Sequence, residues 1–369
     1  MAFRALRAVF GHLRHERLLA CFALLALALA LLDPRSPAAW LDWLQWPTLA
    51  GLAGLLIAIQ GIGDSALVRH FAGKALTHLR TVRGLGVALV LLSALAASVL
   101  TNDVSLFLVV PLTLALDGHV ELPVGRLVTL EAFAVNAGST ASPIGNPQNL
   151  LLWHHAGVGF PAFVAAMWPA AAIMLGLTLL LALIWLPGTR LAVMTAPAPR
   201  VIRGLGTLSV LALAGMVLAL QYRHPLIGML AVGAGFVLCA RRSLRRVDWG
   251  LLATFAAIFL ALGHLSAWPP LVQLLGHLHL QQAGPLYLTG ILASQLISNV
   301  PASVLLTGHT THTLALATAV NVGGYGCVIG SLANLIALRL ARGHLTMTAF
   351  HRVSLPFLLV CAVLVYMLT

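Results

Sequence analysis

The chain has 369 residues, of which 60% are hydrophobic and only 8% are charged. Because about a quarter of the residues of a water-soluble domain are charged, this composition excludes that class and indicates an all-α protein that crosses a membrane many times. The net charge of +12 comes from basic clusters between apolar runs, which is typical of cytoplasmic loops and does not predict a nucleic-acid partner.

The N-terminal part predicts two membrane spans. Four arginines precede an apolar run at 18–32, and no cleavage site for a signal peptide follows it. We therefore expect a first span with a cytoplasmic N-terminus. A second span is expected at 44–62, and the basic stretch 69–83 is expected on the cytoplasmic side.

The apolar segment 84–116 carries a polar triplet at its centre, Thr101, Asn102 and Asp103. At about 1.5 Å per residue, this segment is too long for one crossing and too short for two crossings with a turn. The length predicts a re-entrant helical hairpin with the triplet at its tip.

The next segment, 127–156, is apolar at both ends and polar in the middle. Its centre holds glycines, prolines and side chains that form hydrogen bonds: Asn136, Gly138, Ser139, Thr140, Ser142, Asn146 and Asn149. A lipid-exposed helix must satisfy its own backbone groups, so such a break is tolerated only inside protein or beside a water-filled cavity. We therefore expect a discontinuous helix that contributes to a binding site.

The chain then continues with spans and loops. We expect spans at 162–186, 204–221, 225–240 and 248–265, with a loop at 187–203 between two halves of the chain. A polar outer stretch with His264, His277 and His279 is expected to follow.

A second polar-centred pair repeats the first. A hairpin is expected at 284–308, with Ser298 and Asn299 at its tip, and a broken span at 311–338, before a last span at 349–368. The broken span contains Asn321, Gly323, Gly324, Ser331 and Asn334, and its first asparagine lies 185 positions after Asn136. Paired interrupted segments predict a secondary transporter with internal repeats. We expect a first repeat at 1–186, a linker loop and span at 187–224, and a second repeat at 225–369.

The distribution of the basic residues supports this layout. All 21 lysines and arginines except Arg35 and Arg223 fall on the side predicted to be cytoplasmic. The layout has about nine transmembrane helices plus two hairpins that enter from opposite sides, so the repeats are inverted. The C-terminus is then outside and the N-terminus inside.

The polar residues of the tips and breaks are the candidate substrate-binding residues. Broken helices offer free N–H groups and dipole ends to an anion, and free carbonyls to a cation. Asp103, an ionisable residue at membrane depth, is interpreted as the residue that couples transport to H⁺ or Na⁺, and a structural hydrogen bond is the alternative. Glu131 either contributes to coupling or stabilises a helix end. No metal or cofactor is expected.

At these residues the chain resembles the ion transporter superfamily, which includes arsenical pump membrane proteins and citrate carriers. Gly138 to Asn149 is similar to the family element G-x-x-x-T-P-I-G-x-P-x-N, with serine in place of threonine. The second half is most similar to the arsenite-permease and citrate-transporter-like branch. The triplets T-N-D and S-N-V depart from the S-N-T of dicarboxylate carriers, which argues against a Na⁺-coupled dicarboxylate carrier. The resemblance implies a site between tips and breaks and an elevator-type mechanism.

From these patterns we expect a secondary transporter in the cytoplasmic (inner) membrane for a small anion or oxyacid, such as arsenite, antimonite or a carboxylate, coupled to H⁺ or Na⁺. A homodimer is an open possibility. A cation/proton antiporter on the same scaffold is one alternative. An intramembrane enzyme is another, against which stands the lack of HExxH and GxSxG motifs.

Overall fold

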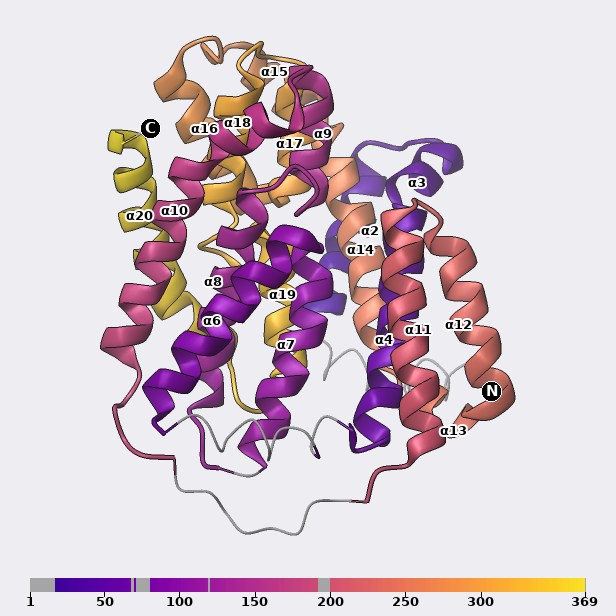
Figure 1. Cartoon of the computed structure of the whole chain (residues 1–369). Coiled ribbons are helices and arrows are strands. Elements are labelled where there is room, and N and C mark those ends of the chain that lie inside the picture. The colour runs from indigo at the N-terminus through magenta and orange to yellow at the C-terminus, as the bar shows by residue number, and fades with distance from the viewer. Residues whose placement is uncertain (1–16, 68–69, 71–79, 119, 192–199, 369) are drawn as a thin grey trace. The chain divides into compact units, whose positions relative to one another are not determined.

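The regular structure of the protein is helical (Figure 1). The computed structural model describes residues 17–67, 70, 80–118, 120–191 and 200–368, and the named elements within these ranges are all helices. Six of them are long and apolar enough to cross a membrane, and four shorter apolar helices accompany them. The chain is therefore an all-α, multi-pass membrane protein.

The described residues form two compact units, and each unit takes one stretch from each half of the chain. Unit 1 combines residues of Met1–Gly61 with Leu208–Leu274, and unit 2 combines Ile62–Thr207 with Leu275–Thr369. The compact units thus cut across the two repeats expected from the sequence, which divide the chain near residue 187.

Unit 1 is a helical bundle in which glycines allow close packing. Gly54 and Gly61 of one helix face Met216 and Ser209 of another so closely that an added Cβ would lie 2.3 Å from Met216 Sδ and from Ser209 Oγ, respectively. The helices that lie mainly in this unit are α2 (Arg17–Leu32), α3 (Pro37–Trp43), α4 (Trp46–Asp64), α11 (Arg203–Gln221), α12 (Pro225–Cys239), α13 (Arg241–Leu244), α14 (Trp249–Ser266) and α15 (Pro269–Gly276).

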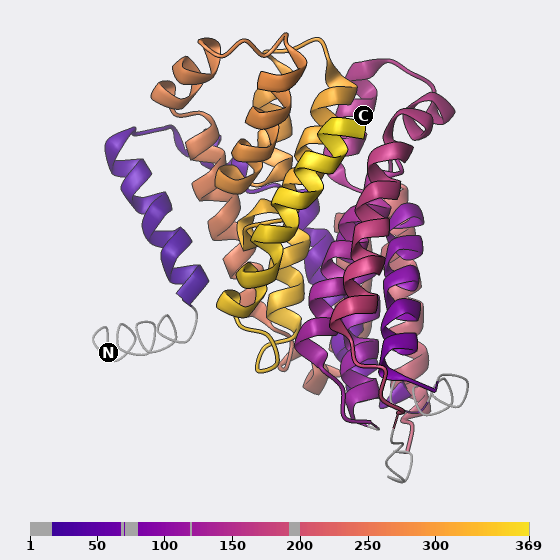
Figure 2. The same ribbon diagram turned by 90° about the vertical axis from the view of Figure 1, so that its left-hand side faces the viewer.

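Unit 2 contains the polar-centred segments. Its helices are α6 (Val82–Val99), α7 (Asn102–Asp117), α8 (Val124–Thr140), α9 (Pro147–Ala156), α10 (Phe160–Trp185), α16 (Ala283–Ile297), α17 (Asn299–Thr307), α18 (Thr313–Gly323), the 3-10 turn η1 (Val328–Gly330), α19 (Leu332–Leu340) and α20 (Met347–Leu368). In Figure 1, α6 and α7 lie in the lower half of this unit and α16 and α17 in its upper half. Helix α20, yellow in Figure 2, packs against α10 and α18.

Two segments of unit 2 leave the helical conformation in the middle. Helix α8 ends at Thr140 and α9 begins at Pro147, where the side chain of Asn146 caps the new helix and proline occupies its first position. Helix α18 ends at Gly323 and α19 begins at Leu332, capped by Ser331. These two segments are called the first break (141–146) and the second break (324–331).

Short turns join the paired helices α6–α7 and α16–α17. The first pair turns at Leu100 and Thr101, and the Thr101 hydroxyl accepts a hydrogen bond from the N–H of Val104. The second pair turns at Ser298 alone, with φ 70° and ψ 154°. This conformation is strained for any residue except glycine.

The structure bears on several of the sequence expectations. Helix α6, in the first expected hairpin, has 18 residues and is long and apolar enough to cross a membrane, and α12, in the span expected at 225–240, has 15. His264 does not lie in an outer loop. It belongs to the last turn of α14 and is fully buried between the rings of Trp40 and Trp43, with Asp33 Oδ2 3.5 Å from its Nε2. Most of the basic stretch 69–83 falls outside the described residues.

Candidate functional site

The two breaks of unit 2 meet through four asparagines that form two matched hydrogen bonds. Asn136 Nδ2 donates to Asn334 Oδ1 at 3.2 Å, and Asn321 Nδ2 donates to Asn149 Oδ1 at 2.5 Å. Because Asn136 and Asn321 occupy corresponding positions 185 residues apart, as do Asn149 and Asn334, the two bonds correspond as well. All four side chains are buried.

Two of these asparagines also cap the carbonyl groups that each break leaves free. Asn149 Nδ2 donates to the carbonyls of Ser139 and Ser142 at 3.1 and 3.0 Å. Asn334 Nδ2 donates to the carbonyls of Gly324 and Cys327 at 2.8 and 3.1 Å. A helix that ends inside apolar surroundings needs such partners, since water is absent there. The asparagines therefore hold both breaks open.

The remaining polar residues of the breaks complete this asparagine network. The hydroxyl of Ser331 donates to Asn136 Oδ1, and Asn146 Nδ2 donates to Asn321 Oδ1 at 2.9 Å. In the first broken segment, the hydroxyls of Ser139 and Thr140 donate to the carbonyl of Asn136, and Ser142 Oγ accepts from the N–H of Ile144. In the second, the carbonyl of Gly323 accepts from Gln295 and the carbonyl of Gly324 accepts from Asn136.

Both helix turns reach the breaks. The N–H of Asn102 donates to the carbonyl of Gly145 at 2.9 Å, which joins the α6–α7 turn to the first break. A Cβ built on Gly324 would lie 3.3 Å from Asn299 Nδ2 and 3.5 Å from Asn136 Oδ1, which places the α16–α17 turn beside the second break. The structure thus brings predicted substrate residues of both halves into one polar cluster, whereas the Thr101 hydroxyl caps α7 and the Ser298 hydroxyl has no hydrogen-bond partner among the described residues.

Gly138 and Gly145 let helix α6 approach the first break. A Cβ on Gly138 would lie 2.0 Å from the carbonyl oxygen of Ala94, and one on Gly145 would lie 2.9 Å from that of Ala97. Position 138 therefore has no room for a side chain larger than that of glycine.

The two candidate coupling acids have different surroundings. Asp103 is buried at the start of α7, and its Oδ1 has no hydrogen-bond partner in the described structure. Glu131 is buried on α8 and accepts a hydrogen bond from the Thr113 hydroxyl of α7, while its Oε2 has no partner among the described residues. Glu131 therefore joins two helices, and Asp103, which follows Asn102 in the chain, has a buried carboxylate oxygen without a partner among the described residues.

Sequence reasoning missed side chains that support the breaks or bind a candidate coupling acid, among them Gln295, Tyr325 and Thr113. Gln295 of α16 donates to the carbonyl of Gly323 at 2.6 Å and accepts from the N–H of Cys327 at 2.7 Å. The hydroxyl of Tyr325 donates to the carbonyl of Phe133, and Thr113 bonds Glu131. The one signal for Gln295 is that it is the only side-chain amide in the largely apolar helix α16.

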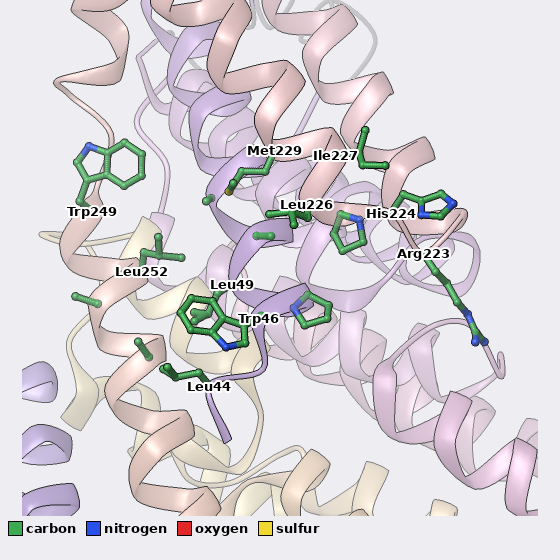
Figure 3. Close-up of a pocket in the computed structure, with 16 residues that line it drawn as sticks. Leu44, Trp46, Leu49, Arg223, His224, Leu226, Ile227, Met229, Trp249 and Leu252 are labelled. Atoms are coloured by element: carbon green, nitrogen blue, oxygen red, sulfur yellow. The ribbon is translucent and has the colours of Figure 1, made fainter. Parts of the chain in front are cut away.

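Unit 1 contains a cavity of different chemistry (Figure 3). Its volume is about 950 Å³, and apolar side chains such as Trp46, Leu49 and Leu252 dominate its lining, with Arg223 and His224 together at one end. Away from Arg223 and His224, a polar solute would lose its hydration there with few hydrogen bonds in return. The polar cluster of unit 2 is therefore the better candidate for a solute site.

The cluster suits reversible binding of a small polar solute. Helices α7, α9, α17 and α19 begin at it, and their N-terminal ends carry partial positive charge. In the described part of the chain, the hydrogen bonds of the asparagine network join uncharged groups. No group of three His, Cys, Asp or Glu residues among the described residues is placed to hold a metal ion.

Comparisons with known proteins identify the family. Residues 12–312 match the family described as Citrate transporter (CitMHS). The chain is 42% identical over 320 residues to the inner membrane protein YbiR of Escherichia coli K12, covering 85% of each chain. It is 31% identical over 303 residues to the uncharacterized transporter MJ0456 of Methanocaldococcus jannaschii, covering 80% of this chain and 81% of that one.

A more distant relative matches only part of the chain. The silicon efflux transporter LSI3 of rice (Oryza sativa subsp. japonica) is 29% identical over 133 residues, which cover 35% of this chain and 27% of LSI3. Together with the apolar helices, the match over most of the chain leads to one conclusion: the protein belongs to the citrate transporter family and is a membrane transporter, not an enzyme.

Proposed function

We propose that this protein is a secondary active transporter that moves a small anion or oxyacid across the cytoplasmic membrane. The observation that carries the proposal is the buried asparagine network, in which two interrupted helices of one unit hold each other open. Amides and helix N-termini bind an anion without a fixed positive charge, so the solute can leave as readily as it enters.

The substrate class follows from the same chemistry. Hydroxyl and amide groups at Asn102, Ser298 and Asn299 can exchange hydrogen bonds with a carboxylate or with the hydroxyls of an uncharged oxyacid. The family description names citrate and the rice relative is named for silicon efflux, so both substrate classes fit. Arsenite and antimonite belong to the oxyacid class.

Coupling to protons is proposed through Asp103. A charged carboxylate beside the cluster would repel an anion, and protonation would remove this repulsion. Proton binding and substrate binding at one site would then depend on each other, as a coupled carrier requires. Na⁺ in place of H⁺ is the competing assignment.

Matching contacts within unit 2 support an inverted repeat. Helix α6 packs on α8 as α16 packs on α18, and α7 packs on α19 as α17 packs on α9. In Figure 1, α9 lies above α8 whereas α19 lies below α18, so the two broken segments run in opposite directions. We propose that unit 2 carries the solute in an elevator-type movement, with two re-entrant hairpins at α6–α7 and α16–α17.

The proposed orientation rests on the basic residues. Arg83 Nε donates to the carbonyl of Leu186 at 3.0 Å, and an Arg126 NH group donates to that of Trp185 at 2.9 Å, so these arginines gather at one end of unit 2. We assign this end to the cytoplasm, with the N-terminus inside and the C-terminus outside.

Transport by everted membrane vesicles tests the proposal. The protein is expressed in a host that lacks related carriers, and the change in internal pH is recorded when arsenite, citrate, silicic acid or Na⁺ is added in turn. A proton flux that depends on an anion or oxyacid supports the proposal. A flux that depends on Na⁺ alone would establish the cation/proton antiporter instead, and the absence of any solute-dependent flux would contradict both.

A further inference from the structure

The second break is held by side chains from two neighbouring helices. Gln295 of α16 binds both Gly323 and Cys327, and the hydroxyl of Ser354 on α20 donates to the carbonyl of Gly326 at 2.5 Å. Each break is also capped by an asparagine of the helix that follows it, Asn149 for the first break and Asn334 for the second. The shape of the second break therefore depends on α16 and α20.

His351 of α20 contributes the bond to η1, the 3-10 turn of the second break. The N–H of Val328 donates to His351 Nε2 at 3.0 Å. A ring nitrogen accepts a hydrogen bond only when it carries no proton, so His351 must be neutral here with its proton on Nδ1. Protonation would place an N–H on Nε2 facing the N–H of Val328, and the two donors would repel each other.

His351 is partly exposed near the start of its helix. It lies in the second turn of α20, is half-buried, and belongs to the basic end of unit 2, beside Arg352. An ordinary histidine changes charge between pH 5 and 8.

Few charged side chains near His351 are available to bind its ring. Among the described residues, α10, α18 and η1, which pack against α20, contain no Asp, Glu, Lys or Arg. The titratable or charged side chains on the break and on α8, which also touches α20, are Cys327, Tyr325, Arg126 and Glu131. Three of these four side chains form hydrogen bonds elsewhere: Arg126 donates to the carbonyl of Trp185, Glu131 accepts from Thr113, and Tyr325 donates to the carbonyl of Phe133.

We propose that His351 is a positioning residue that keeps the second break in its binding shape only while its imidazole is neutral. Acid at the basic end of unit 2 then breaks the bond to Val328, loosens the segment between Gly324 and Ser331, and slows transport. The effect on transport rests on the proposed function, whereas the effect on the segment itself does not.

Three variants separate the contributions. His351→Gln keeps an acceptor at nearly the same reach but cannot titrate, and His351→Leu removes the acceptor. His344→Gln is the matched control, because His344 is an exposed histidine at the same end of unit 2. Hydrogen–deuterium exchange of a peptide covering 324–331 is measured at several pH values on the full chain in nanodiscs, and exchange transport is measured with equal pH on both sides.

The expected result is a pH-dependent difference between the wild-type protein and His351→Gln. After correction for intrinsic exchange, lowering the pH from 8 to 5 exposes the segment about three- to tenfold more in the wild-type protein and in His344→Gln, but not in His351→Gln. His351→Leu shows the exposed level at every pH. Transport falls by a similar factor in the wild-type protein relative to His351→Gln.

The outcomes also separate this inference from the proposed function. Equal exchange of 324–331 in the wild-type protein, His351→Gln and His351→Leu at all pH values overturns the role of His351. If exchange behaves as expected but no anion or oxyacid is transported, His351 holds the break and the proposed function is wrong. ¹⁵N NMR of labelled histidine provides an independent check, since an Nε2–H tautomer at pH 8 would contradict the inference.

Discussion

Asn136 and Asn334, which are 198 residues apart in the chain, form a hydrogen bond between the two broken helical segments, with 3.2 Å between Nδ2 and Oδ1. Asn136 also accepts from Ser331 and donates to the carbonyl of Gly324. One buried side chain of α8 thus contacts two residues of the second break and one of the helix that follows it, which ties the two broken segments together.

The pair predicts non-additive effects on stability. Asn136→Ala leaves the Asn334 amide oxygen and the Ser331 hydroxyl without their partner, and an unsatisfied buried group costs about 1–3 kcal/mol. Asn334→Ala should have a similar effect, and the double variant should lose less than the sum of both. Thermal unfolding in nanodiscs measures this, and strictly additive losses would show that the two side chains do not interact.

The lack of space beside Gly138 predicts that a larger residue at this position disrupts the packing of α6 on α8. In Gly138→Ala the new methyl group meets the backbone of Ala94, which cannot move without displacing α6, so we expect a loss of at least about 1–3 kcal/mol. Gly176→Ala in α10 is the control, because nothing lies within 4 Å of its added Cβ. The control should be neutral or gain about 0.5–1 kcal/mol. Equal stability of the two variants would refute the close approach of α6 to α8.

Substitutions at Ser298 should affect the stability of the protein and its substrate binding in different ways. Its φ of 70° is strained, and its buried hydroxyl has no partner among the described residues. Ser298→Gly should therefore stabilise the protein by about 1–3 kcal/mol while weakening substrate binding. Ser298→Ala removes the same hydroxyl and retains the strain, so it should weaken binding without the gain. If both variants transport with the wild-type KM, the hydroxyl does not contact the substrate.

Asp103 predicts a loss of proton coupling. Asp103→Asn keeps the size of the side chain and removes its charge, so uptake driven by a pH gradient should stop while solute exchange at equal pH continues. Asp42→Asn, at an exposed position on α3, should leave both activities unchanged. Reconstituted proteoliposomes give both measurements. Gradient-driven uptake at the wild-type rate in Asp103→Asn would contradict a role of Asp103 in coupling.

The sequence predicts well those features that have local causes. Asn146 and Pro147 stop and restart a helix by themselves, and Thr101 caps the helix that follows it, so helix ends there can be read directly from the residues. The second break carries no such proline, and its helix restarts with the cap at Ser331. The polar clusters at corresponding positions also indicate which residues belong to one site.

Features that depend on contacts between distant segments could not be predicted in this way. The support from Gln295 and His351 depends on how α16 and α20 pack against the second break, and nothing in their local sequence fixes that packing. His264 is a polar residue but is buried against Trp40 and Trp43, which lie over 200 positions earlier in the chain. Each compact unit combines two stretches that are far apart in the chain, and this division cannot be predicted from local sequence patterns either.

The self-capping of the first break has a consequence for biosynthesis. Asn149 satisfies the carbonyls of Ser139, Thr140 and Ser142 from within the same segment, whereas its partner Asn321 is translated much later. The first break can therefore enter the bilayer from the ribosome with its ends already protected. The late-arriving second half then completes a partly formed site, and truncation of the nascent chain before Asn321 should leave an inserted but incomplete protein.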